Sequence, residues 1–164
     1  MRPKFTKYFM DFAELTASLS YAKRLKVGAV IVKDNGQIIG NGYNGMPSGW
    51  DNNCEIEVYE TQEVSSGKAY GQEFTTYKMN VPVLKTKPQV LHAESNALLK
   101  VARSTESCEG ATMFCTHAPC MDCAKLIFQS GITTIYYKNQ YRDDAGIKFL
   151  AGSGVNVHQY ADSI

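Results

Sequence analysis

The chain has 164 residues, which is enough for one domain that buries a core without disulfide bonds. Charged residues make up 20% of the chain and the formal net charge is +1, which argues against nucleic acid or an anionic membrane as a partner. No apolar run reaches the ~18 residues that cross a bilayer, and the first residues lack the apolar core of a signal peptide. Five cysteines is an odd number for a disulfide framework. We therefore expect a cytoplasmic protein whose cysteines bind metal or react.

The amino-terminal part predicts one helix and one hairpin. An amphipathic helix is expected over 7–23, where apolar side chains recur at helical spacing: Tyr8, Phe9, Phe12, Leu15 and Leu19. The β-branched segment 27–33 and the extended segment 37–44 flank the turn residues 34–36. This pattern is typical of a β-hairpin.

The segment from about 45 to 90 interrupts the regular pattern. It is rich in Gly, Ser, Asn and Thr, with scattered aromatic residues and no clear period. Irregular segments of this length inside a compact domain tend to be functional. We expect a loop-rich insert that contains a short helix over 54–63.

Helices and strands alternate after the insert. Helices are expected over 92–104, 119–131 and 143–154, and strands over 111–117, 132–139 and 155–160. Single helices between successive strands imply right-handed parallel crossovers. The sequence therefore predicts a single domain over 1–164, with three α/β/α layers and an antiparallel hairpin at one side of a five-stranded mixed sheet.

Four residues at two expected helix starts form a candidate metal site. Cys120 and Cys123 lie three apart on one helix face, and the positive helix end favours their thiolate forms. His92 begins another expected helix. Three ligands leave the fourth tetrahedral position of zinc open for water, which is typical of a catalytic zinc site. Glu94, two residues after His92, is the candidate carboxylate for proton transfer beside the metal.

The cysteine pair has two other interpretations, a redox-active pair and a closed structural zinc site. A redox-active pair usually occurs in a thioredoxin-like context, which this chain lacks. A closed structural zinc site needs a fourth ligand, for which the candidates are Cys108, Cys115 and His117. His-Ala-Glu followed by Pro-Cys-x-x-Cys matches the zinc-deaminase signature, which favours the catalytic site.

Over 5–49 and 91–160 the sequence resembles the deoxycytidylate (dCMP) deaminases, a branch of the cytidine deaminase-like zinc hydrolases. The motifs that carry the resemblance are VGAVIV, GYNGMPSG, HAESNA, EGATMF, PCMDCAKLI and SGI. The run GYNGMPSG at 42–49 is typical of the dCMP branch. The resemblance implies a cytidine deaminase-like fold and the zinc-dependent conversion of dCMP to dUMP and ammonia, which feeds dTMP synthesis. It also implies that Glu94 moves the protons.

The same resemblance implies the substrate contacts. Asn44 is expected to hold the sugar of the substrate, and Ala93 is expected to contact the substrate as well. The 5′-phosphate needs cations or hydroxyls near the pocket, and the candidates are Tyr141, Arg142, Arg24 and Lys26.

Regulation and assembly are further implications of the resemblance. It implies a homohexamer that dCTP activates together with Mg²⁺ and that dTTP inhibits. Effector contacts are expected near the GYNG segment and in parts of the insert, at Lys26, Tyr43, Gly45 and Met46. Some relatives bind a second zinc through two cysteines and a histidine. Cys54 fits one of these positions, but 22–26 has no cysteine and 50–90 has no histidine, so we expect one zinc.

Two other function classes were compared with this one. Another zinc deaminase of the superfamily, acting on nucleic acid, needs a basic surface. Seventeen basic residues against sixteen acidic ones, without a Lys/Arg cluster, argue against that. Deaminases of free bases or nucleosides share the zinc motif but not GYNGMPSG. A non-catalytic, zinc-stabilised binding protein would need neither Glu94 nor an open coordination position.

Overall fold

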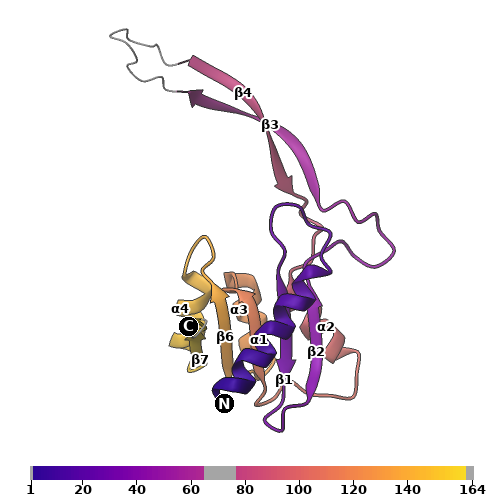
Figure 1. Ribbon diagram of the computed structural model, residues 1–164, viewed down its shortest axis with the longest axis vertical. Coiled ribbons are helices and arrows are strands. Elements are labelled where there is room, and N and C mark those ends of the chain that lie inside the picture. Colours follow the sequence, from indigo (N-terminus) through magenta and orange to yellow (C-terminus); the bar gives the residue numbers. More distant parts are fainter. Residues whose placement is uncertain (1, 65–76, 162–164) are drawn as a thin grey trace.

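A five-stranded sheet forms the centre of the computed structural model, which describes residues 2–64 and 77–161 (Figure 1). Its strands are β1 (Gly28–Val32), β2 (Ile38–Tyr43), β5 (Thr112–His117), β6 (Thr134–Asn139) and β7 (Asn156–Gln159). They lie in the order β2–β1–β5–β6–β7. Strand β1 is antiparallel to both neighbours, whereas β5, β6 and β7 are parallel. The predicted mixed sheet, with its hairpin and parallel crossovers, is confirmed.

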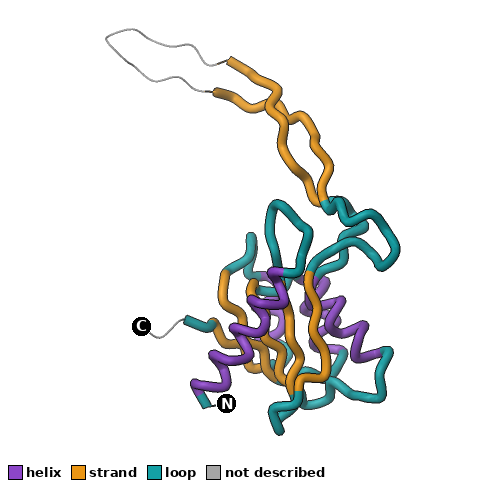
Figure 2. The backbone as a smooth tube through the Cα atoms, turned by 45° about the vertical axis from the view of Figure 1, so that its right-hand side comes forward, coloured by secondary structure: helices purple, strands orange, loops and turns teal. Residues whose placement is uncertain are grey.

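Helices cover both faces of this sheet (Figure 2). They are α1 (Pro3–Ser18), α2 (Ala93–Ala102), α3 (Met121–Gln129) and α4 (Ala145–Gly152). Helix α1 packs on one face, and the other three pack on the opposite face. Within the described residues, no helix has the length and apolar character that a membrane crossing requires.

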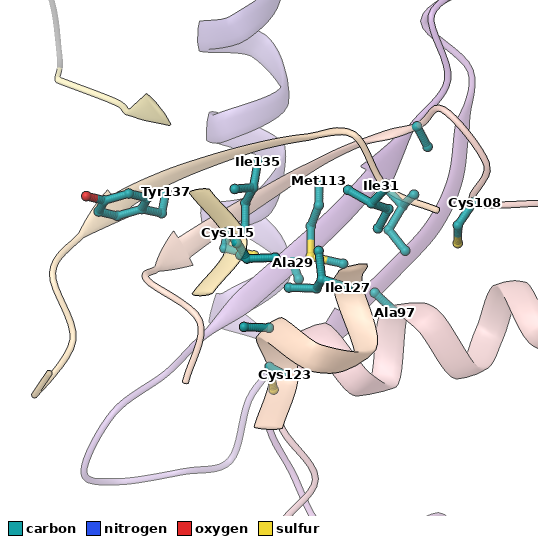
Figure 3. Packing of buried hydrophobic residues seen from close by; sticks show 14 of the residues in the cluster. Ala29, Ile31, Ala97, Cys108, Met113, Cys115, Cys123, Ile127, Ile135 and Tyr137 are labelled. Atoms are coloured by element: carbon teal, nitrogen blue, oxygen red, sulfur yellow. The ribbon is translucent and has the colours of Figure 1, made fainter. Parts of the chain in front are cut away.

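The central strands are buried on both faces because their side chains alternate between the two sides of the sheet. Ala29 and Ile31 of β1 belong to the cluster beneath α2 and α3, together with Met113 and Cys115 of β5 (Figure 3). The intervening residues of β1 and β5 pack against α1 instead. Two large apolar clusters therefore fix the sheet between its helix layers.

Helix α1 buries a different face from the one predicted. Phe9 is buried, but Tyr8, Leu15 and Leu19 are 56%, 65% and 57% exposed. Gly28 of β1 explains the difference, because a Cβ at this position would lie 2.1 Å from the Ala13 carbonyl oxygen. At Ala13 and Ala17 the helix approaches the backbone of Gly28 so closely that only small residues fit there, whereas Phe9 and Met10 pack on the sheet elsewhere.

The insert forms a second, two-stranded sheet that projects from the body (Figures 1 and 2). Strands β3 (Glu55–Val64) and β4 (Tyr77–Thr86) pair in antiparallel register, and we call this hairpin the arm. The short helix expected over 54–63 is therefore wrong. Ile56 and Val58 alternate with glutamates in β3, which is the two-residue period of a strand. The described insert residues outside the arm are irregular, and 65–76 lie outside the described residues.

Helix α2 lies unusually close to β2. A Cβ added at Gly42 would lie 2.3 Å from the Ala93 carbonyl oxygen and 2.5 Å from the Ala97 backbone nitrogen. Real Cβ atoms do not approach backbone atoms this closely, so only glycine lets the helix settle at this distance. Gly42 therefore fixes the first turn of α2 against the sheet.

We expect Gly42→Ala to lower the free energy of unfolding by about 1–3 kcal/mol, because the added methyl group overpacks a backbone contact. Urea denaturation would measure this loss. The matched control is Gly152→Ala in α4, where an added Cβ meets no atom within 4 Å. A Gly42→Ala protein as stable as the control would contradict the close-packing account.

Candidate functional site

The ends of several strands meet at one edge of the central sheet. Strands β2 and β5 run in the same direction because each is antiparallel to β1. Asn44 follows β2, His117 ends β5, Tyr141 follows β6, and Val27 precedes β1. All four residues line one cavity of about 440 Å³. This volume lies within the usual range for small-molecule sites.

Two helices begin beside this cavity. His92 is the N-cap of α2, and Cys120 is the N-cap of α3, with Cys123 in its first turn. The His92 Nδ1 lies 3.5 Å from Cys120 Sγ and 3.4 Å from Cys123 Sγ. An isolated bridge between Gly45 and Leu91 holds the segment before α2 against the end of β2. The structure thus brings the three predicted ligands together.

The three donor atoms have the spacing of a zinc site. They all lie within 4.8 Å of one another. In a tetrahedral site with a Zn–S distance of about 2.3 Å and a Zn–N distance of about 2.0 Å, nitrogen and sulfur ligands are about 3.5 Å apart. The observed nitrogen–sulfur separations of 3.4 and 3.5 Å match this value. The three donors thus fit a zinc ion and leave its fourth tetrahedral position open. This donor set is typical of a catalytic zinc site.

No fourth ligand joins this cluster among the residues that the structure describes. Cys108 and Cys115, which were candidates for a closed structural site, are buried in the apolar core. His117 lies in the same cavity, but its Nδ1 lies 3.1 Å from the Thr116 hydroxyl instead. The geometry therefore favours an open site over a closed one.

The two cysteines differ in their affinity for a proton. Hydrogen bonds with the Cys123 thiol and His92 lower the pKa of Cys120 to about 4. The hydrogen bond to Cys120 and burial raise the pKa of Cys123 above its usual value. Cys120 is therefore the more acidic thiol of the pair, and a bound cation favours the thiolate form of both.

Glu94 is a buried carboxyl group beside the cluster. It is 4% exposed, lines the cavity and is not one of the three clustered donors. Burial raises the pKa of its carboxyl group above the usual value. A carboxylate that takes up a proton readily, next to a metal site but not in it, can act as a general base and then as a general acid.

Asn44 lines the cavity and also supports its wall. Its Oδ1 accepts the Val27 N–H at 2.8 Å, and its Nδ2 donates to the Leu25 carbonyl at 2.8 Å. A carboxamide offers two donors and two acceptor positions. One N–H and one lone pair of Asn44 therefore remain for a ligand.

The remaining predicted residues fall into two groups. Ala93, Tyr141, Arg142 and Arg24 line the cavity with the cluster. Four expected effector contacts lie elsewhere: Lys26, Tyr43, Gly45 and Met46 are not among the cavity residues. Lys26 instead donates to the Ser18 carbonyl at 3.5 Å.

Several cavity residues were not expected from the sequence as substrate contacts. His117 was considered only as a possible ligand, although its place directly before the Pro-Cys segment was a usable signal. Burial lowers the pKa of His117 below its usual value, so it is neutral at pH 7. Thr86, at the end of β4, also lines the cavity. No sequence pattern predicted that the arm contacts the site. Gln140 directly precedes the predicted Tyr141.

The surroundings of Cys54 are apolar. Cys54 is fully buried and clusters with Ala22 and Val90, with Met46 packed against them. Burial raises the pKa of the Cys54 thiol. A protonated thiol among apolar side chains is a packing residue.

Comparisons with known proteins agree with this geometry. The family model for the cytidine and deoxycytidylate deaminase zinc-binding region matches residues 3–139. The chain is 33% identical over 162 residues to a deoxycytidylate deaminase of Saccharomyces cerevisiae, which covers 98% of this chain and 46% of the relative. It therefore spans about half the length of that relative.

Two phage proteins match over most of their own length. The deoxycytidylate deaminase of Enterobacteria phage T4 is 36% identical over 148 residues, covering 80% of this chain and 76% of the relative. The dCMP deaminase of cyanophage S-TIM5, solved in complex with dCMP and dUMP, gives a TM-score of 0.77 and 40% identity. That match covers 98% of this chain and 99% of the other. The chain belongs to the cytidine and deoxycytidylate deaminase family.

Proposed function

We propose that this chain is a zinc-dependent deaminase that hydrolyses dCMP to dUMP and ammonia. One observation carries the proposal: an open cluster of His92, Cys120 and Cys123 shares a cavity with the buried carboxyl group of Glu94. The names of the relatives supply the nucleotide, because both phage relatives are dCMP deaminases and one was solved with dCMP and dUMP. We propose that the enzyme acts in the cytoplasm and that its product dUMP is used for dTMP synthesis.

Glu94 moves the protons in the proposed reaction. A zinc ion held by His92, Cys120 and Cys123 supplies the Lewis acidity that makes water nucleophilic at neutral pH. Glu94 takes a proton from the attacking water and delivers it to ring N3, which makes C4 more electrophilic. Glu94 then takes the proton of the new C4 hydroxyl and passes it to the amine, so that the C4 carbonyl forms as the C4–N bond breaks and ammonia leaves. One water enters and one ammonia leaves, so Glu94 ends in its starting state.

The cavity offers groups for the rest of the nucleotide. The unused N–H and lone pair of Asn44 suit a sugar hydroxyl, and Ala93 offers a small side chain beside the base. Tyr141 and Arg142 suit the 5′-phosphate. The Arg142 guanidinium lies 5.4 Å from the centre of the Tyr141 ring, a stacking contact that orients it.

Regulation and assembly belong to the same proposal. We propose a homohexamer activated by dCTP with Mg²⁺ and inhibited by dTTP, with effector contacts near Tyr43, Gly45 and Met46. Tyr43 ends β2, and Gly45 and Met46 follow it in the segment that leads to the arm. Effector binding there is coupled to the cavity through Asn44, which is adjacent in sequence to Tyr43 and Gly45.

The purified chain is expected to contain one zinc per polypeptide, because the described residues provide one cluster of ligands. Cys123→Ser should lower the zinc content and abolish dCMP turnover, whereas Cys54→Ala should change neither. Metal analysis by mass spectrometry, with an absorbance assay on dCMP, measures both. Two zinc ions per wild-type chain, one of them lost in Cys54→Ala, would show that Cys54 binds metal.

Glu94→Gln is expected to retain zinc but to lose at least the ~10²–10⁴-fold rate enhancement typical of general acid–base catalysis. The amide keeps the shape of the side chain but cannot take up the proton of the attacking water. Steady-state kinetics and metal analysis on one preparation test this expectation. Glu57→Gln, at an exposed position of the arm, is the matched control. Near wild-type turnover by Glu94→Gln would remove Glu94 from the mechanism.

Turnover of dCMP should be sigmoidal and become hyperbolic when dCTP and Mg²⁺ are added, because an activator shifts coupled subunits to one state. Initial rates over a range of dCMP concentrations, with and without dCTP or dTTP, measure this change. Hyperbolic kinetics that neither triphosphate alters would refute the regulatory part of the proposal and leave the catalytic part intact.

A further inference from the structure

The segment between α1 and β1 forms one wall of the cavity. Arg24 lines the cavity from this segment, and Arg142 lines it from the segment after β6. Among the described residues that line the cavity, these two are the Lys or Arg side chains. Lys23 and Lys26 flank Arg24 closely in sequence but are not cavity residues. Of the three basic residues in this part of the wall, Arg24 is the one that lines the cavity.

The base of the arm holds the backbone of this wall. Glu55, the first residue of β3, is 4% exposed although it is a carboxylate. Its Oε1 accepts the backbone N–H of Lys23 at 2.9 Å and that of Arg24 at 3.2 Å. Its Oε2 is buried and makes no hydrogen bond within the described part of the chain. Burying a carboxylate is unfavourable unless its interactions compensate, so this contact fixes the loop firmly.

The cross-strand partner of Glu55 holds the side chain of the same arginine. Thr86 pairs with Glu55 at the first position of the β3–β4 register. The Thr86 hydroxyl accepts a hydrogen bond from Arg24 Nη1 at 3.2 Å. Thr86 also lines the cavity, so this bond holds the guanidinium at the cavity wall. One residue pair of the arm thus fixes both the backbone and the guanidinium of Arg24.

We propose that Glu55 and Thr86 are positioning residues that hold Arg24 at the cavity, where its guanidinium binds the anionic group of the substrate. The inference rests on the proposed function, in which that group is a nucleotide phosphate. A guanidinium is always charged and presents several N–H donors in a fixed plane, so it can bind Thr86 with one nitrogen and a phosphate with the others. Glu55 and Thr86 thus fix the orientation of the Arg24 guanidinium before the substrate binds.

The test is calorimetric titration of the zinc-loaded chain with dUMP. Arg24→Ala should weaken dUMP binding about ten- to hundredfold, the usual range for a charged hydrogen-bonding partner. Lys23→Ala is the matched control, because it removes a charge from the same segment but keeps the backbone N–H that binds Glu55. It should change the affinity by no more than about twofold. Equal binding by wild type and Arg24→Ala would overturn the inference.

A double-mutant cycle separates positioning from general destabilisation. Thr86→Val, which keeps the shape but removes the acceptor, should weaken dUMP binding about threefold or more in the wild-type background. In the Arg24→Ala background the same substitution should have no further effect. An equal effect of Thr86→Val in both backgrounds would show that Thr86 does not act through Arg24.

Variants of Glu55 test the backbone contact. Glu55→Ala should weaken dUMP binding, whereas Glu55→Gln should restore most of the affinity, because its amide oxygen accepts the same two N–H groups. If Glu55→Ala does not fold, the Thr86 cycle still decides the question. Wild-type turnover of dCMP is assayed separately. A chain that binds dUMP with this mutational pattern but does not deaminate dCMP would uphold the positioning role and refute the proposed reaction.

Discussion

The site depends on the position of two helix N-termini relative to each other at one edge of the sheet. Nitrogen and sulfur ligands of one zinc ion must lie about 3.5 Å apart, so a displacement of an ångström would separate them. Helix α2 is fixed by its close contact with Gly42. The start of α3 is fixed through β6, because Asn139 accepts the Ala118 N–H at 2.8 Å and donates to Thr116 at 2.9 Å. The scaffold thus holds His92, Cys120 and Cys123 close together.

The same arrangement gives neighbouring groups opposite proton affinities. Cys120 lies at a helix N-terminus and contacts Cys123 and His92, which lower its pKa to about 4. Glu94 lies in the first turn of α2 and is buried, which raises the pKa of its carboxyl group. Environments that push neighbouring pKa values apart are how a site separates groups that hold charge from groups that carry protons. Cys120 and Glu94 thus have opposite pKa shifts, although both lie at helix starts beside one cavity.

Local sequence patterns predicted those parts of the fold that depend on local chemistry. The helix starting near His92, the Pro-Cys-x-x-Cys helix start and the alternating strands are all present within a few residues. The buried face of α1 was not predictable, because it is set by the absence of a side chain at Gly28 on another element. The arm was not recognised because its strands bury few residues, and because the alternation of glutamates with Ile56 and Val58 ends before Tyr59. Residues of the candidate site were predicted where a motif carried them, as for Glu94.

The rest of the cavity wall depends on contacts between segments far apart in the sequence. The segment between α1 and β1 has no regular secondary structure at residues 23–27, so its backbone groups need partners elsewhere. Asn44 supplies two of them from the end of β2, and Glu55 supplies two more from the arm. Along the chain the arm separates the GYNGMPSG motif from the HAESNA motif. In three dimensions its first residue pair completes the wall of the cavity, so the insert is part of the site's construction rather than an addition to a finished domain.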